Sequence, residues 1–135
     1  MLRIALLLVL AVVLAGCGGG GNTTLESTTN LTITYWPDGK GKGPQQHFNL
    51  SCDPTVGNVA DPIAACADLK GPVREAFDPT PLSAMCTELY GGPAEATIVG
   101  TVDGDVVNAR LSRSNGCEIG RWQDLSALLP TFQPA

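Results

Sequence analysis

Alternating apolar and polar positions mark the most regular parts of the chain. Residues 31–36 alternate apolar with β-favouring polar side chains, which predicts a half-buried strand. Residues 47–52 predict a second strand. Two further β-rich runs, over 94–102 and 105–113, flank Asp103-Gly104, a dipeptide typical of a type I′ hairpin turn. These runs predict antiparallel strands joined by turns.

Short helical segments lie between and after these strands. Asp61-Pro62 predicts a helix over 63–69, with Asp61 as the N-cap and Pro62 as the first helical residue. A further helical turn is predicted over 73–77, and an amphipathic segment over 122–129. Residues 53–57 are predicted to form a turn. The order of elements predicts an α+β fold with one antiparallel sheet.

The first thirty residues have a different pattern. Arg3 precedes an apolar run over residues 4–16, which spans roughly 20 Å as a helix and is too short to cross a bilayer. This arrangement predicts a signal peptide, and the run that ends at Cys17 resembles the bacterial lipobox. We therefore expect a lipoprotein signal peptide over 1–16, a lipidated Cys17, and a flexible Gly/Thr-rich tether over 17–30. The alternative is an ordinary secretory signal peptide. The expected location is extracytoplasmic, with the chain attached to the bacterial cell membrane through its lipid.

Charge and composition restrict the function. Eight Lys and Arg against thirteen Asp and Glu give a net charge of −5, which argues against a nucleic-acid partner. His47 is the only histidine, and no serine lies in a nucleophile motif. The composition predicts a small folded domain that is not an enzyme and needs no cofactor.

Five cysteines are an odd number for an exported protein. Lipidation of Cys17 leaves an even set in an oxidising compartment: Cys52, Cys66, Cys86 and Cys117. Four cysteines allow three disulfide pairings, and the sequence by itself does not choose between them. Without a Cys-x-x-Cys pair or a second histidine, no metal site is expected.

Three cysteine-containing segments resemble a known family. They are Ala64-Ala65-Cys66-Ala67-Asp68-Leu69, Cys86-Thr87-Glu88-Leu89-Tyr90 and Ser114-Asn115-Gly116-Cys117-Glu118. In this order they resemble the Streptomyces subtilisin inhibitor family of secreted serine-protease inhibitors, over residues 31 to about 118. The resemblance implies a folded domain over 31–135 with a five-stranded antiparallel sheet and two helices. It also implies disulfides Cys52–Cys66 and Cys86–Cys117, and a homodimer packed through the sheet.

The resemblance also implies a mechanism and a set of site residues. A loop after the third cysteine enters the cleft of a serine protease as a substrate does and is cut only slowly. By position, Cys86 anchors the loop and Thr87 precedes Glu88, the primary specificity residue. Leu89 follows the scissile bond, and Tyr90 comes next. Asn115 corresponds to an asparagine that supports the loop from behind.

Two features of the loop bear on the target. A carboxylate buried in an apolar specificity pocket costs several kcal/mol, so Glu88 favours a Glu-specific protease as the partner. Gly91-Gly92 adds a residue before Pro93 and is expected to loosen the loop. Both features also favour an alternative function, a non-inhibitory cell-envelope binding or structural lipoprotein that keeps the inhibitor fold.

Overall fold

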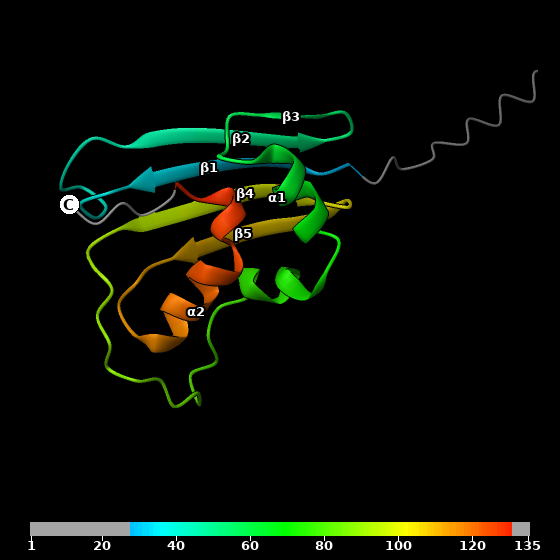
Figure 1. Cartoon of the computed structure of the whole chain (residues 1–135). Coiled ribbons are helices and arrows are strands. Elements are labelled where there is room, and N and C mark those ends of the chain that lie inside the picture. Colours follow the sequence, from blue (N-terminus) through cyan, green and yellow to red (C-terminus); the bar gives the residue numbers. More distant parts are fainter. Residues whose placement is uncertain (1–27, 131–135) are drawn as a thin grey trace, which may run out of the picture.

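The computed structural model describes residues 28–130 as one antiparallel sheet with helices packed on one of its faces (Figure 1). The five strands have the order β3-β2-β1-β4-β5. Their bounds are β1 Asn30–Trp36, β2 Gln46–Cys52, β3 Thr55–Gly57, β4 Glu95–Val102 and β5 Asp105–Leu111. The helices are α1 Pro62–Asp68, the 3₁₀ helix η1 Pro72–Phe77, α2 Gly116–Asp124 and the 3₁₀ helix η2 Ser126–Leu128. The predicted fold class is confirmed.

The strand register places alternate side chains in the core. In the central strand β1, Ile33 pairs with Phe48 of β2 and with Ile98 of β4. Ile33 and Ile98 are fully buried against the helices. At the β4–β5 turn both Asp103 and Gly104 have positive φ, 49° and 84°, as a type I′ turn requires. The predicted hairpin is therefore confirmed.

The C-terminal helices close the core over the sheet. Trp122 of α2 packs on Tyr35 with ring centroids 6.1 Å apart, and Leu125, Leu128 and Leu129 are buried beside it. Burial raises the pKa of Tyr35 above its ordinary 10.0, and the nearby Arg113 partly offsets this shift. At the start of α1, the Asp61 carboxylate accepts a 2.9 Å hydrogen bond from the Ala64 amide, which confirms the predicted N-cap.

Two elements differ from their prediction. The predicted turn over 53–57 contains the short strand β3, which pairs with β2. All three residues of β3 are exposed, so no apolar alternation marks it in the sequence. Helix α2 begins at Gly116, six residues before the predicted start at Trp122, because Asn115 caps it. The first turn of α2 contains the disulfide-bonded Cys117 and has no apolar stripe from which its helical conformation could be predicted.

The last residues of the predicted tether belong to the folded domain. Thr29 is buried, and its hydroxyl oxygen accepts a 3.0 Å hydrogen bond from the Asp103 amide. The carbonyl oxygen of Thr28 accepts hydrogen bonds from Gly104 N and Thr101 Oγ1. Residues 1–27, which include Cys17 and the predicted signal peptide, lie outside the described residues, as do 131–135. Over 28–130 no helix is long and apolar enough to cross a membrane.

The face of the sheet away from the helices is mostly polar. Thr32 and Asn49 lie opposite one another on it, and Val56, Val99 and Val106 are its exposed apolar side chains. The homodimer implied by the family resemblance would use this face, and it stays a prediction.

Candidate functional site

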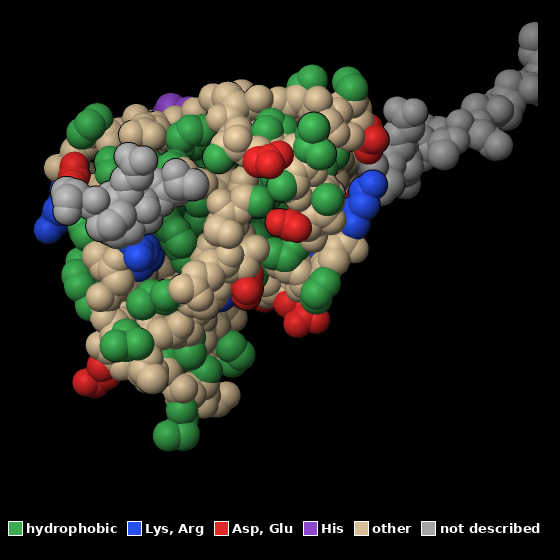
Figure 2. Space-filling view, viewed as in Figure 1, with side chains coloured by type: hydrophobic (Ala, Val, Ile, Leu, Met, Phe, Trp, Pro, Cys, Tyr) green, Lys and Arg blue, Asp and Glu red, His purple; other side chains and the backbone are tan. Residues whose placement is uncertain are grey.

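Residues 78–94, between η1 and β4, form a long segment without regular structure that we call the projecting loop. It extends away from the sheet (Figure 1), and apolar side chains protrude at its tip (Figure 2). Leu82 and Met85 are fully exposed, and Leu89 and Tyr90 are 64% and 69% exposed. Apolar side chains grouped in water are typical of a surface that binds another macromolecule.

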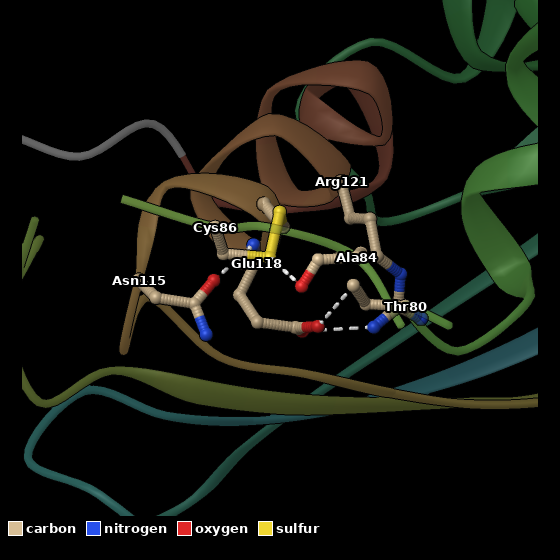
Figure 3. Close-up of a disulfide and its surroundings, with 7 residues drawn as sticks. Thr80, Ala84, Cys86, Asn115, Glu118 and Arg121 are labelled. Atoms are coloured by element: carbon tan, nitrogen blue, oxygen red, sulfur yellow. Dashed lines mark hydrogen bonds and ion pairs between the residues drawn. A yellow bond between two sulfur atoms is a disulfide. The ribbon is translucent and has the colours of Figure 1, made fainter. Parts of the chain in front are cut away.

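Two disulfides fix the fold, and one of them holds the projecting loop. Cys86 is bonded to Cys117 in the first turn of α2, with Cα atoms 5.3 Å apart (Figure 3). Cys52 is bonded to Cys66 and joins β2 to α1, with Cα atoms 5.6 Å apart. Both pairings implied by the family resemblance are confirmed. The Cys86–Cys117 disulfide fastens the loop two residues before Glu88.

Backbone hydrogen bonds fix the loop on either side of Glu88 and Leu89. The amide of Gly116 donates to the carbonyl oxygen of Thr87 at 3.0 Å. The amide of Gly91 donates to the carbonyl oxygen of Arg113 at 2.7 Å. Three consecutive exposed residues, Glu88, Leu89 and Tyr90, lie between these two fixed points. The Glu88–Leu89 peptide bond is therefore presented to solvent on a short span that is held at both ends.

Two glycines make this attachment possible. A Cβ atom at Gly116 would overlap the side-chain oxygen of Thr87, so glycine lets the helix approach the loop without displacing Thr87. A Cβ at Gly91 would lie 3.1 Å from Arg113 Cβ and from Ile119 Cδ1. Gly91 thus lies close to its neighbours, and the expectation that the Gly91-Gly92 pair loosens the loop stays a prediction.

Asn115 acts on the loop through helix α2. Its side-chain oxygen accepts a 3.0 Å hydrogen bond from the Glu118 amide and caps the helix that carries Gly116 and Cys117 (Figure 3). Within the part of the chain that the structure describes, its side chain makes no hydrogen bond to residues 87–90. Direct support of the loop by Asn115 stays a prediction. The Asn-x-x-Glu spacing is the signal in the sequence from which the cap was predictable.

A largely buried ion pair holds the start of the projecting loop, and it was not among the residues predicted from the sequence. Arg121 Nη1 lies 2.8 Å from Glu118 Oε2, and the two side chains are only 12% and 15% exposed. The Thr80 hydroxyl donates to the other oxygen of Glu118 at 2.6 Å (Figure 3). The Arg121 guanidinium also donates to the carbonyl oxygens of Ala76 and Phe77, at 3.1 and 3.4 Å. This network ties α2 to both η1 and the first residues of the loop.

Within 28–130 no three His, Cys, Asp or Glu side chains come together in a way that would hold a metal ion. His47 lies on the exposed sheet face, where its ring nitrogens contact Thr34 and Gln45. The candidate site is the Cys86 to Tyr90 segment of the projecting loop, which is held by the disulfide and by backbone hydrogen bonds and exposes residues 87–90.

Comparison with known proteins identifies the family. A family model described as subtilisin inhibitor-like matches residues 25–115, more than half of the chain. The chain is also similar to a solved structure of Streptomyces caespitosus sermetstatin in complex with Bacillus licheniformis subtilisin. The identity is 22%, with 75% of this chain and 94% of that chain covered and a TM-score of 0.45. No curated protein matches the chain. From the family match, the chain belongs to the subtilisin inhibitor-like family, whose members are serine-protease inhibitors and not enzymes.

Proposed function

We propose that this chain is a lipid-anchored, extracytoplasmic inhibitor of a serine protease, and that its projecting loop binds the protease cleft as a substrate does. The observation that carries the proposal is the exposed Glu88–Leu89 bond, which lies between the Gly116–Thr87 and Gly91–Arg113 hydrogen bonds. A protease cleft receives an extended backbone, and among residues 28–130 this segment has no regular structure and is exposed.

Preorganisation explains why such a loop would inhibit. A flexible peptide loses conformational freedom when it binds, about 0.5–1.5 kcal/mol for each side chain that becomes fixed. Here the Cys86–Cys117 disulfide and the two backbone hydrogen bonds have already restricted the loop in the free protein. After cleavage the same attachments would hold the new ends next to each other. Resynthesis of the bond would then compete with release of the products.

The residue at the scissile bond indicates the class of target. Glu88 is exposed and would enter the primary specificity pocket of the protease. An apolar pocket would leave this carboxylate buried without a partner, at a cost of several kcal/mol, whereas a basic pocket would pair with it. The proposed target is therefore a Glu-specific serine protease. Exposed Leu82 and Met85, before the bond, offer additional apolar contact area.

The membrane location rests on sequence features alone. The lipobox-like end at Cys17 and the tether that follows support attachment by acyl chains, with the domain held off the membrane surface. Metabolic labelling with a radioactive fatty acid should mark the wild-type chain and leave a Cys17→Ser variant unlabelled. Equal labelling of the two chains would refute the anchor without affecting the inhibitor proposal.

Inhibition is tested by titration of the mature chain, residues 17–135 with Cys17→Ser, against a Glu-specific serine protease, trypsin and subtilisin. We expect tight inhibition of the Glu-specific enzyme. Glu88→Lys should transfer inhibition to trypsin, because a lysine then faces its acidic pocket. The matched control is Glu75→Lys, the same charge change at an exposed residue of η1, which should leave the pattern unchanged. Rapid cleavage at Glu88, or no inhibition of any of the three enzymes, would favour the non-inhibitory envelope lipoprotein.

A further inference from the structure

Cleavage of the Glu88–Leu89 bond would divide the projecting loop into two halves. The half before the bond is held by its disulfide and by the hydrogen bond from the start of α2. The half after the bond, residues 89–94, contains no cysteine. It runs beside the segment that leads from β5 to α2 (Figure 1), where the Gly91 amide donates to the Arg113 carbonyl oxygen at 2.7 Å. The position of a new amino terminus at Leu89 therefore depends on the surroundings of Arg113.

The Arg113 side chain runs along the two glycines of this second half. A Cβ atom at Gly91 would be 3.1 Å from Arg113 Cβ, and a Cβ atom at Gly92 would be 3.7 Å from Arg113 Nη1. The side chain thus begins beside Gly91 and ends beside Gly92. Its guanidinium carbon also lies 5.9 Å from the centre of the buried Trp122 ring. Arg113 therefore connects the aromatic part of the core to the part of the loop that follows the scissile bond.

Burial of Arg113 makes it suited to hold these glycines in place. Its Nε and Nη1 atoms are buried, so the end of the side chain is enclosed by the fold. Glycine loses more conformational freedom on ordering than any other residue, and Gly92 has a φ of 111°. Without side chains of their own, Gly91 and Gly92 depend on their neighbours for a fixed position. The Arg113 side chain offsets the freedom that this pair would otherwise give the loop.

We propose that Arg113 is a positioning residue for resynthesis of the Glu88–Leu89 bond, because it holds the half of the loop that carries the new amino terminus. The inference rests on the proposed inhibitor function. In resynthesis the Leu89 α-amine attacks the Glu88 carbonyl carbon of the acyl-enzyme. The C–N bond forms, the ester bond to the protease serine breaks, and the enzyme's general base carries a proton from the amine to the serine oxygen. An amine that is kept within reach lets this step compete with hydrolysis.

The contribution of Arg113 should be larger in the cut chain than in the intact chain. In the intact chain Leu89 is also held by its peptide bond to Glu88, whereas in the cut chain only the contacts on its own side remain. The entropy of fixing the backbone of one residue corresponds to about a 5- to 30-fold change in an equilibrium constant. In Arg113→Ala the equilibrium ratio of cut to intact chain should therefore rise by about this factor.

The first experiment measures this ratio. The mature chain, residues 17–135 with Cys17→Ser, is brought to equilibrium with a catalytic amount of a Glu-specific serine protease, and the two forms are quantified by mass spectrometry. The matched control is Arg110→Ala, an exposed arginine of β5, which should keep the wild-type ratio. Arg113→Lys, which keeps the stem of the side chain, should raise the ratio less than alanine and serves in its place if alanine prevents folding. An unchanged ratio in the Arg113 variants, or an equal rise in Arg110→Ala, would overturn the proposal.

The second experiment separates the role of Arg113 from the inhibitor function. Amide hydrogen exchange is measured by NMR on intact and cut chains without protease. After the cut, the Gly91 amide should stay protected in the wild type and exchange on the order of tenfold faster in Arg113→Ala, while the amides of β1 and β4 keep their protection. Equal Gly91 exchange in the two cut chains would overturn the proposal. A cut wild-type chain with a protected Gly91 amide that is never resealed would refute the inhibitor function, while the role of Arg113 in holding the new amino terminus would stand.

Discussion

Substitution of Gly116 by alanine tests whether the position of the loop is what makes it an inhibitor. Gly116 is the first residue of α2, and its amide holds the carbonyl of Thr87 next to Glu88. The new methyl group would overlap Thr87 Oγ1 and would lie 3.3 Å from Thr87 Cβ. Because α2 is held by the buried Trp122, the exposed Thr87 and the loop residues after it are the part that shifts.

The size of the effect follows from the strain of this contact. Overpacking a fitted site costs about 1–3 kcal/mol. In the free variant the exposed residues from Thr87 onward shift locally, within the limit set by the Cys86–Cys117 disulfide, and relieve this strain, so the stability of the fold should change little. In the complex the protease requires the original loop conformation, and the strain returns. At about 1.4 kcal/mol for each factor of ten, binding should weaken by about 5- to 150-fold.

The assay compares inhibition constants and cleavage rates at Glu88–Leu89 for the wild type, Gly116→Ala and Gly120→Ala. Gly120 is the matched control, because it lies in the same helix and no atom lies within 4 Å of the Cβ position. Alanine at 120 should stabilise the helix by up to about 1 kcal/mol and leave inhibition unchanged. A Gly116→Ala variant that inhibits as well as the wild type would refute the claim that this contact positions the loop.

Three further predictions concern stability. Replacing Cys86 and Cys117 together by serine should cost roughly 4 kcal/mol for a closed loop of this length, seen in urea denaturation, and should turn the inhibitor into a rapidly cut substrate; slow cleavage would contradict this. Glu118→Ala should cost about 3 kcal/mol, since it leaves Arg121 without its largely buried partner, and a loss under 1 kcal/mol would show that the ion pair is only a surface contact. Because burial raises the pKa of Tyr35, the unfolded chain releases this proton first, and stability should fall as the pH rises above about 10. In Tyr35→Phe the unfolding free energy should fall less steeply with pH above about 10 than in the wild type. An unchanged dependence on pH would exclude Tyr35 as its cause.

Local features of the fold were predictable because their signals are local. The alternation in β1, the Asp103-Gly104 turn and the Asp61 cap each depend on residues within a few positions of one another. Strand β3 was missed because its side chains are all exposed and it exists only through pairing with β2. Thr28 and Thr29 were assigned to the tether because their partners are more than seventy residues away, at the β4–β5 turn.

The order of the cysteine-containing motifs predicts the candidate loop. The contacts that hold this loop in place could not be predicted from the sequence. The contact between Gly116 and Thr87 joins residues 29 positions apart, and a glycine after an asparagine is ordinarily a turn residue. The Glu118–Arg121 spacing was visible, yet nothing local indicates that this pair is largely buried or that it reaches Thr80.

The most direct test of the inhibitor mechanism is whether the Glu88–Leu89 bond can be remade. Intact chain and chain already cut at this bond are each incubated with a catalytic amount of a Glu-specific serine protease, and the ratio of the two forms is followed by mass spectrometry. If the disulfide and the backbone hydrogen bonds hold the cut ends in place, both samples should converge on the same mixture of intact and cut chains. If the intact chain is converted completely and the cut chain is never resealed, the loop is an ordinary substrate and the account is contradicted.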